Sequence, residues 1–231
     1  MTEMEVKGCI FDLDGVIVDT AKFHFLAWKR LADQLEIHFT LEDNERLKGV
    51  SRMESLEIIL EIGNISLPAE TKNEYAELKN KWYVEYISRM SDEDILPGCL
   101  QFIIELKKAG IRVAIGSASK NTPLILSRIG LSDLFDAVAD GNNVSNAKPN
   151  PEVFLKAADM IGIEPGKCIV FEDAIAGVQA ALNAGMMCVG VGSAEVLTKA
   201  HIVISDLSKM NLEMLEMAGN EIGLQKKNDF S

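Results

Sequence analysis

The sequence predicts an α/β fold: a doubly wound parallel sheet core with an inserted α-helical domain. Short apolar runs alternate with helical stretches from residue 97 onward, and these runs are too apolar to leave either face of a strand in water. Residues 21–92 differ, because they contain several helical stretches and no strand-like run. We therefore expect a core domain of residues 1–20 and 93–231, with residues 21–92 as a smaller helical domain.

The elements of the core follow from apolar runs of strand length and from the amphipathic stretches between them. The expected strands are residues 6–11, 111–116, 134–139, 167–171, 187–191 and 201–204. The expected helices of the core are residues 98–109, 122–130, 151–162 and 174–185.

The inserted segment has apolar and aromatic residues at helical spacing. One helix face carries His24, Trp28, Leu31 and Leu35, and a second carries Tyr75, Leu78, Trp82 and Tyr86. The chain returns to the core at "LPG", residues 96–98, where proline and glycine are typical of a connection.

Composition limits the kind of partner. The chain of 231 residues carries a formal net charge of −12, which disfavours binding to nucleic acid or to an anionic membrane surface. We therefore expect a small-molecule ligand. The sequence has neither a signal segment nor an apolar run of membrane-spanning length, so we expect a cytoplasmic protein. The four cysteines lack CxxC spacing and are expected to be buried free thiols.

Acidic, hydroxyl and basic side chains follow four of the expected strands. In an open parallel sheet, the carboxyl ends of the strands form the ligand crevice. We therefore expect four carboxylates, one ammonium group and several small hydroxyl side chains at a single edge. They are Asp12 and Asp14 after the first strand, residues 117–121 after the second, Lys148 after the third, and Glu172 and Asp173 after the fourth.

Carboxylates gathered at one edge raise one another's pKa values and need a compensating positive charge. A divalent cation would supply it, and ligands that are all oxygen favour Mg²⁺ over Zn²⁺. Each acidic or hydroxyl residue could instead cap the helix after its strand. Capping does not account for the lysine, so the whole set favours a metal site beside a bound anion.

Two segments favour a phosphate as that anion. In "GSASKNTP", residues 116–123, glycine and small residues open a helix, so backbone N–H groups and the helix dipole can face an anion. In "NAKPNPEVF", Pro149 keeps Lys148 extended, Asn150 can cap a helix and Pro151 suits its first position. Lys148 could then reach a phosphoryl oxygen, although a solvated surface lysine is the simpler alternative for this residue alone.

With a metal and a phosphate present, an aspartate can act as a nucleophile, because it is already ionised at neutral pH. A second acid two residues along a strand projects to the same side and can protonate the leaving oxygen. The spacing alone does not assign these two roles between Asp12 and Asp14.

Together, "FDLDGVIVDT", Ser117, Lys148 and "FED" resemble the four motifs of the haloacid dehalogenase-like phosphotransferase superfamily, in their usual order. The resemblance implies a doubly wound core with an α-helical cap at residues 21–92. It implies that Asp12 is the nucleophile and Asp14 the general acid/base. It further assigns the transferring phosphate to Ser117, Ala118 and Lys148, and Mg²⁺ to Asp12, the backbone carbonyl of Asp14, Glu172 and Asp173.

Within that superfamily, "DTAKFHFLAW", "LKGVSRMESL", "LKNKW" and "SASKN" are similar to the β-phosphoglucomutase subfamily. The resemblance implies that Arg52 and residues 119–121 hold the phosphate that is not transferred, and that His24, Lys48 and Lys79 link cap closure to Asp14 and the sugar. His24 could instead pack inside the cap, and "FEDA" departs from the residues common around Glu-Asp in the subfamily. The implied substrate-binding residues are Thr20, His24, Trp28, Lys48, Gly49, Val50, Ser51, Arg52, Lys79, Ser119, Lys120 and Asn121.

The expected activity is a Mg²⁺-dependent phosphomutase that interconverts β-glucose 1-phosphate and glucose 6-phosphate, primed by β-glucose 1,6-bisphosphate. A mutase must grip two phosphates and a phosphatase one, so the second set of cationic residues favours the mutase. A sugar-phosphate phosphatase with water as acceptor is the alternative. A non-catalytic binding protein is disfavoured, because Asp12, Asp14, Lys148 and Asp173 are all present. No apolar helix stripe is left unexplained, which favours a monomer.

Overall fold

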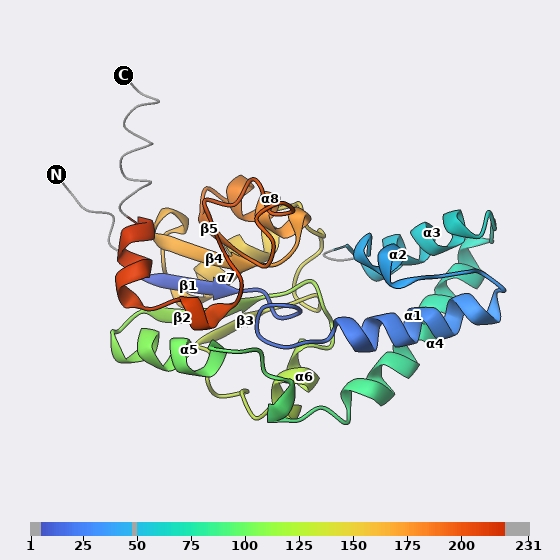
Figure 1. Ribbon diagram of the computed structural model, residues 1–231, viewed down its shortest axis with the longest axis horizontal. Helices are drawn as coiled ribbons and strands as arrows, with labels where there is room; N and C mark the ends of the chain where they lie inside the picture. Colours follow the sequence, from blue (N-terminus) through green and yellow to red (C-terminus); the bar gives the residue numbers. More distant parts are fainter. Residues whose placement is uncertain (1–5, 48–49, 220–231) are drawn as a thin grey trace, which may run out of the picture.

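The computed structural model describes residues 6–47 and 50–219, and within them the chain forms a six-stranded parallel sheet. Its strand order is β3-β2-β1-β4-β5-β6, so the chain winds outward from β1 in both directions (Figure 1). This order confirms the doubly wound sheet and the six expected strands. They are β1 (Gly8–Phe11), β2 (Arg112–Gly116), β3 (Ala137–Ala139), β4 (Cys168–Glu172), β5 (Met187–Val191) and β6 (Ile202–Ile204).

Helices cover both faces of the sheet. On one face, α5 (Cys99–Lys108) and α6 (Thr122–Arg128) bury apolar side chains in the same cluster as Phe11 and Phe171. On the other face, α7 (Glu152–Ile161) and α8 (Ile175–Asn183) pack in a cluster with Ile10 and Val170. Because side chains alternate along a strand, consecutive residues of β1 and β4 supply both clusters. The apolar runs seen in the sequence are therefore strands buried on both faces.

The third strand differs most from the expectation, since the sequence predicts residues 134–139 and the strand covers Ala137–Ala139. Side-chain hydrogen bonds satisfy backbone groups at Leu134, just before the strand, and at Val113 of β2. The carboxylate of Asp136 accepts the backbone N–H of Val113 at 2.8 Å, and the Lys107 ammonium donates to the carbonyl of Leu134 at 2.7 Å. The ladder therefore begins later than the apolar run does.

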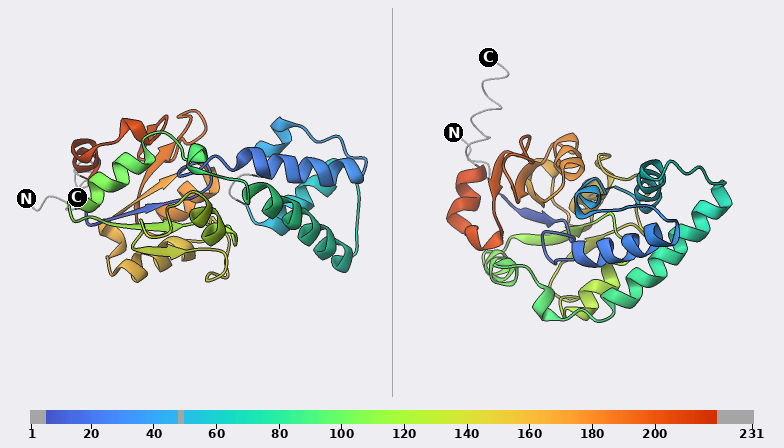
Figure 2. Two further views of the ribbon diagram at one scale, coloured as in Figure 1. Left: turned by 90° about the horizontal axis from the view of Figure 1, so that it is seen from below. Right: turned by 45° about the vertical axis from the view of Figure 1, so that its right-hand side comes forward.

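Four helices form a second part of the molecule, beside the carboxyl ends of the strands (Figures 1 and 2). α1 and α4 pack against each other, with the rings of His24 and Tyr83 4.1 Å apart. Trp28 of α1 is buried in an apolar cluster that also contains Phe11 of the sheet. The expected boundaries of the two domains stay a prediction. The helices are α1 (Ala21–Gln34), α2 (Leu41–Glu45), α3 (Arg52–Ile62) and α4 (Ala69–Ile87).

Two connecting segments join the helical part to the sheet, and they are bonded to each other. Val18 and Ile95 form an antiparallel bridge, and the N–H of Leu96 donates to the carbonyl of Ile17 at 2.9 Å. One residue further out, the N–H of Asp19 donates to the carbonyl of Asp94 at 3.1 Å. The chain thus leaves and re-enters the core at one place. Among the described helices, none has both the length and the apolar character needed to cross a membrane.

An aromatic cluster fills the face of the sheet below the strand ends. The rings of Phe11 and Phe171 stack at 4.7 Å between centroids, and Phe102 of α5 meets both edge-on, at 6.3 and 5.6 Å. Such edge-to-face pairs add to the free energy gained from burial. The cluster holds the ends of β1 and β4 side by side.

We expect Phe102→Ala to lower the free energy of unfolding by about 3–5 kcal/mol, because it leaves a cavity under two buried rings. Urea denaturation measures the change. Leu100→Ala in the same helix is the matched control, since Leu100 is 43% exposed and its truncation should change stability by less than about 1 kcal/mol. Equal effects from the two variants would contradict this account of the core.

Candidate active site at the carboxyl ends of the strands

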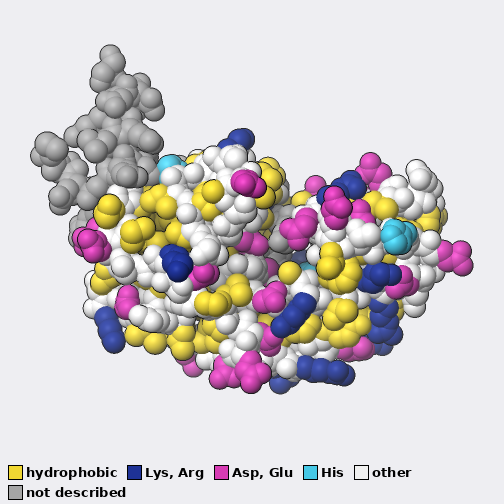
Figure 3. Space-filling view, in the orientation of Figure 1, with side chains coloured by type: hydrophobic (Ala, Val, Ile, Leu, Met, Phe, Trp, Pro, Cys, Tyr) yellow, Lys and Arg dark blue, Asp and Glu magenta, His cyan; other side chains and the backbone are white. Residues whose placement is uncertain are grey.

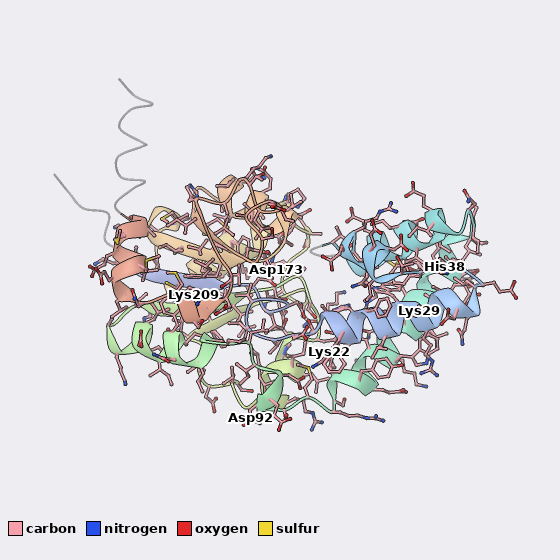
Figure 4. All side chains as sticks on the ribbon, in the orientation of Figure 1. Lys22, Lys29, His38, Asp92, Asp173 and Lys209 are labelled. Atoms are coloured by element: carbon pink, nitrogen blue, oxygen red, sulfur yellow. The ribbon has the colours of Figure 1, made fainter. Side chains whose placement is uncertain are left out.

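The ends of β1 and β4 bring two predicted acidic residues together. These strands are neighbours in parallel register, with Phe11 opposite Phe171, and the backbone N–H of Asp12 donates to the carbonyl of Phe171 at 2.9 Å. The next residues, Asp12 and Glu172, are both buried. Figure 4 shows Asp173 at the junction of the sheet and the helical part, where the space-filling view is indented (Figure 3).

The Lys148 ammonium lies between these two carboxylates. Its Nζ is 2.5 Å from Oδ1 of Asp12 and 2.6 Å from Oε1 of Glu172, and its side chain is only 2% exposed. The nitrogen also lies 4.7 Å from the centre of the Phe154 ring. The other oxygen of Glu172 accepts the backbone N–H of Ala174 at 2.7 Å. Lys148 is thus buried among acids rather than solvated on the surface.

The loop before α7 holds Lys148 in this position. The Glu152 carboxylate accepts the backbone N–H groups of Ser145 and Asn146 at 2.9 and 2.7 Å. Asn150 accepts the N–H of Glu152 through its side chain at 3.0 Å. The N-cap of α7 is Pro151 rather than Asn150, because the helix begins at Glu152, one residue later than expected. Asn183 donates to the carbonyl of Pro149 at 3.0 Å. Both sides of Lys148 are therefore fixed.

Burial raises the pKa of Asp12 to about 7. The charge of Lys148 opposes this rise, and the charges of Glu172 and Asp14 add to it. Burial alone would lower the pKa of Lys148, but Asp12 and Glu172 raise it above its ordinary value. Lys148 therefore stays protonated, and one ammonium does not fully compensate the acids around it. The site can accept further positive charge.

The predicted metal ligands provide only oxygen donors, which suits Mg²⁺. In the part of the chain that the structure describes, no three His, Cys, Asp or Glu side chains are grouped as a metal site, and Lys148 occupies the space between Asp12 and Glu172. The assignment of Mg²⁺ to Asp12, Asp14, Glu172 and Asp173 stays a prediction.

The Asp14 carboxylate accepts a hydrogen bond from the Thr20 hydroxyl, which is fully buried just before α1. Burial raises the pKa of Asp14, while the bond from Thr20 and the charges of Lys148 and Lys79 oppose this shift. A carboxyl group whose pKa lies above the usual range can hold and release a proton nearer neutral pH. Thr20, predicted as a substrate contact, here positions Asp14.

A buried cationic cluster lies in the helical part. Lys79 of α4 is 3.0 Å from Nδ1 of His24 and lies over the rings of Trp28 and Tyr83, at 4.5 and 4.7 Å. Burial lowers the pKa of Lys79 to about 7, with Arg52 adding to the shift and Asp14 opposing it. Burial, Lys79 and Arg52 lower the pKa of His24 well below its ordinary value, so the neutral imidazole can accept a hydrogen bond from the lysine ammonium. The structure thus brings His24, Trp28 and Lys79 together.

The loop after β2 begins with the buried residue Ser117, whose Oγ accepts the N–H of Ser119 at 3.1 Å. Ser119 in turn accepts the N–H of Asn121 at 3.2 Å. Ala118 and Lys120 are exposed. The Asn121 side chain donates to Asn80 of α4 at 3.1 Å, so this loop contacts the helical part.

The remaining predicted cap residues lie at the start of α3. Ser51 caps this helix, because its Oγ accepts the N–H of Glu54 at 3.2 Å, and Arg52 donates to Oε1 of Glu77 at 2.8 Å. Val50, which precedes the N-cap residue Ser51, is partly exposed. Lys48 and Gly49, also predicted as substrate contacts, lie outside the described residues.

Two glycines that the sequence reasoning missed make room for the acids. A Cβ on Gly177 would lie 1.7 Å from Oε1 of Glu172, and one on Gly15 would lie 2.1 Å from Oδ2 of Asp173. Gly15 also has a φ of +81°, which favours glycine. A glycine inside a helix after two acids is the signal that could have pointed to Gly177.

The chain has close relatives of known name. The haloacid dehalogenase-like hydrolase family matches residues 6–185. A β-phosphoglucomutase of Bacillus subtilis is 44% identical over 216 residues, 91% of this chain and 94% of that protein. A crystal structure of β-phosphoglucomutase from Clostridium difficile matches with a TM-score of 0.90 and 43% identity, covering 95% of this chain and 99% of that one. A phosphorylated carbohydrates phosphatase of Thermotoga maritima is 30% identical over 184 residues, 78% of this chain and 82% of that protein.

We expect Gly177→Ala to lower turnover and to destabilise the fold by about 1–3 kcal/mol, because the added methyl group overlaps Glu172 and must displace it from Lys148. Steady-state kinetics and urea denaturation measure the two effects. Gly166→Ala is the control, since a Cβ there has nothing within 4 Å and should leave both unchanged. A fully active Gly177→Ala protein of unchanged stability would rule out this packing.

Lys79→Met should remove a pH dependence of stability between about pH 7 and pH 10. The folded pKa is lowered to about 7 from 10.5, so in this range the unfolded chain binds more protons. The native protein should therefore gain stability relative to Lys79→Met as the pH rises, by at most about 1.4 kcal/mol per unit. The advantage of the variant should be largest below pH 7, where the buried ammonium is charged.

Urea denaturation at several pH values measures this difference. Lys81→Met is the control, because Lys81 is exposed on the same helix and its replacement should leave the pH dependence of the native protein intact. Parallel stability curves for Lys79→Met and the native protein would show that Lys79 is not destabilised by its burial.

Proposed function

Because the chain belongs to the haloacid dehalogenase-like hydrolase family, we propose that it is a β-phosphoglucomutase, which interconverts β-glucose 1-phosphate and glucose 6-phosphate. The relatives of that name at 44% and 43% identity support this activity over most of the chain. The observation that carries the proposal is the presence of two separate cationic centres. Lys148 lies among the acids of the sheet, and Lys79 with Arg52 lies on the helices opposite. A sugar bisphosphate carries two phosphates, one for each centre.

In the proposed reaction, Asp12 attacks a phosphorus atom of β-glucose 1,6-bisphosphate and becomes an acyl phosphate as the sugar oxygen leaves. Phospho-Asp12 then donates this phosphoryl group to the free hydroxyl of a bound sugar phosphate, giving the bisphosphate, which reorients and returns its other phosphate to Asp12. Lys148 is already paired with Asp12, and its ammonium can also pair with an oxygen of the phosphoryl group once that group is on Asp12. Ser117 and Ala118 border the same strand ends and complete the proposed phosphate contacts. Mg²⁺, held by Asp12, the carbonyl of Asp14, Glu172 and Asp173, would neutralise charge on the transferring phosphate.

Asp14 moves the proton in this scheme. It protonates the oxygen of the leaving sugar and later takes the proton from the accepting hydroxyl. Its contacts suit both roles, since Thr20 donates to it and Lys79 favours its charged form. The priming donor is β-glucose 1,6-bisphosphate, which supplies the first phosphoryl group to Asp12 and is regenerated in each cycle.

The helical part, residues 21–92, is the proposed cap. Its residues His24, Trp28, Ser51, Arg52 and Lys79, together with Thr20 just before it, bind the sugar phosphate or position Asp14. Lys48, Gly49 and Val50 complete the set. Residues 119–121 and Arg52 hold the phosphate that is not transferred. Closure of such a cap excludes water, which would otherwise hydrolyse the acyl phosphate. We propose a monomer, since one chain carries every group named.

The test is to incubate the protein with β-glucose 1-phosphate, Mg²⁺ and a trace of β-glucose 1,6-bisphosphate. Formation of glucose 6-phosphate without stoichiometric free phosphate is the expected result. Free phosphate without glucose 6-phosphate would instead identify a sugar-phosphate phosphatase that uses water as the acceptor.

We expect Asp12→Ala to abolish turnover and phosphorylation of the protein, and Asp14→Asn to lower kcat by about 10²–10⁴-fold while Asp12 can still be phosphorylated. Mass spectrometry after addition of the bisphosphate detects the phosphoprotein. Asp159→Asn is the control, because Asp159 is exposed on α7, away from the strand ends. Unchanged turnover in Asp12→Ala would disprove the covalent mechanism.

A further inference from the structure

Helix α4 is hydrogen-bonded to two residues, Arg52 and Asn121, that are proposed to bind the phosphate that is not transferred. Glu77 accepts a hydrogen bond from Arg52 at 2.8 Å, and Asn80 accepts one from Asn121 at 3.1 Å. Glu77 and Asn80 are three residues apart, so they lie on neighbouring positions of one helix surface. Arg52 comes from the start of α3 and Asn121 from the loop after β2. Both therefore have a partner on α4 before any ligand binds.

The two partners differ in charge. Asn80 is neutral, but Glu77 offers Arg52 a carboxylate, and a guanidinium makes the same kind of charge-assisted bond to a carboxylate as to a phosphate. The Arg52 side chain is 25% exposed and that of Glu77 is 74% exposed, so the carboxylate can leave for solvent without losing its hydration. Arg52 is also close enough to the buried cluster to lower the pKa of Lys79 and His24.

We propose that Glu77 is a competing anion, which occupies Arg52 until a phosphate displaces it; this inference rests on the proposed function. To bind Arg52, the phosphate that is not transferred must replace the bond between Arg52 and the Glu77 carboxylate. The displaced carboxylate remains nearby and repels the phosphate. A ligand that has no phosphate to place at Arg52 leaves the Arg52–Glu77 pair intact. Glu77 therefore weakens the binding of substrates and product while leaving the chemistry at Asp12 unaffected.

A second ion pair between the same two helices provides a matched control. Lys72 of α4 is 2.7 Å from Oε1 of Glu57 on α3, and neither residue belongs to the proposed site. Glu57→Gln removes an α3–α4 ion pair without freeing Arg52. Any effect of Glu77→Gln that Glu57→Gln lacks is therefore specific to Arg52 rather than to the packing of the helices.

The experiment is a calorimetric titration of the native protein, Glu77→Gln and Glu57→Gln with glucose 6-phosphate. Glu77→Gln should bind about two- to fivefold more tightly than the native protein, and Glu57→Gln should bind as the native protein does. The difference should shrink at high salt, because an exposed pair and its repulsion are screened. In an Arg52→Gln background, Glu77→Gln should give a smaller gain, because only the repulsion between the carboxylate and the phosphate is then removed.

Unchanged or weaker binding by Glu77→Gln would overturn the proposal, because Glu77 would then only hold Arg52 in place. The rate at which acetyl phosphate, which has a single phosphate, phosphorylates Asp12 should be equal in the native protein and Glu77→Gln. A slower rate in the variant would also overturn it. Because the titration measures binding, a native protein that binds glucose 6-phosphate but forms none from β-glucose 1-phosphate would refute the proposed function and still test Glu77.

Discussion

The contact of Lys148 with both Asp12 and Glu172 is the interaction on which the rest of the site depends. Two carboxylates at the ends of adjacent buried strands repel each other, and burial makes their charged forms costly. A protonated lysine between them allows both to remain at the strand ends. The clamp of Glu152 on the preceding loop and the space left by Gly177 serve this one contact.

A second charged centre lies across from the first. Lys79 lies within hydrogen-bond distance of His24 inside the helical part, and the charges of Lys79 and Lys148 both act on Asp14. The acid that is proposed to move the proton is thus positioned by the core and the helices together. In the proposed site, the helical part therefore contributes a charge that acts on Asp14 and does not only cover the core.

The six strands and the acids at their ends could be predicted, because apolar runs and motif spacing are properties of short stretches of sequence. The glycines that admit Glu172 and Asp173, the bond from Thr20 to Asp14, and the partners of Arg52 and Asn121 could not. Each is a contact between segments far apart in the chain or depends on a side-chain direction. The third strand was predicted too long, since an apolar run does not reveal that Asp136 bonds to Val113 through its side chain.

The bonded pair of connecting segments constrains how the helical part can move. Ile17, Val18 and Asp19 are each tied to the returning segment, so the two segments cannot slide past each other or separate without breaking several backbone bonds. The two segments must therefore move together, and a rotation of the helical part would turn about this one place. A rotation has the largest effect far from its axis. Arg52, at the start of α3, would sweep through a long arc while Asp14, beside the axis, hardly moves.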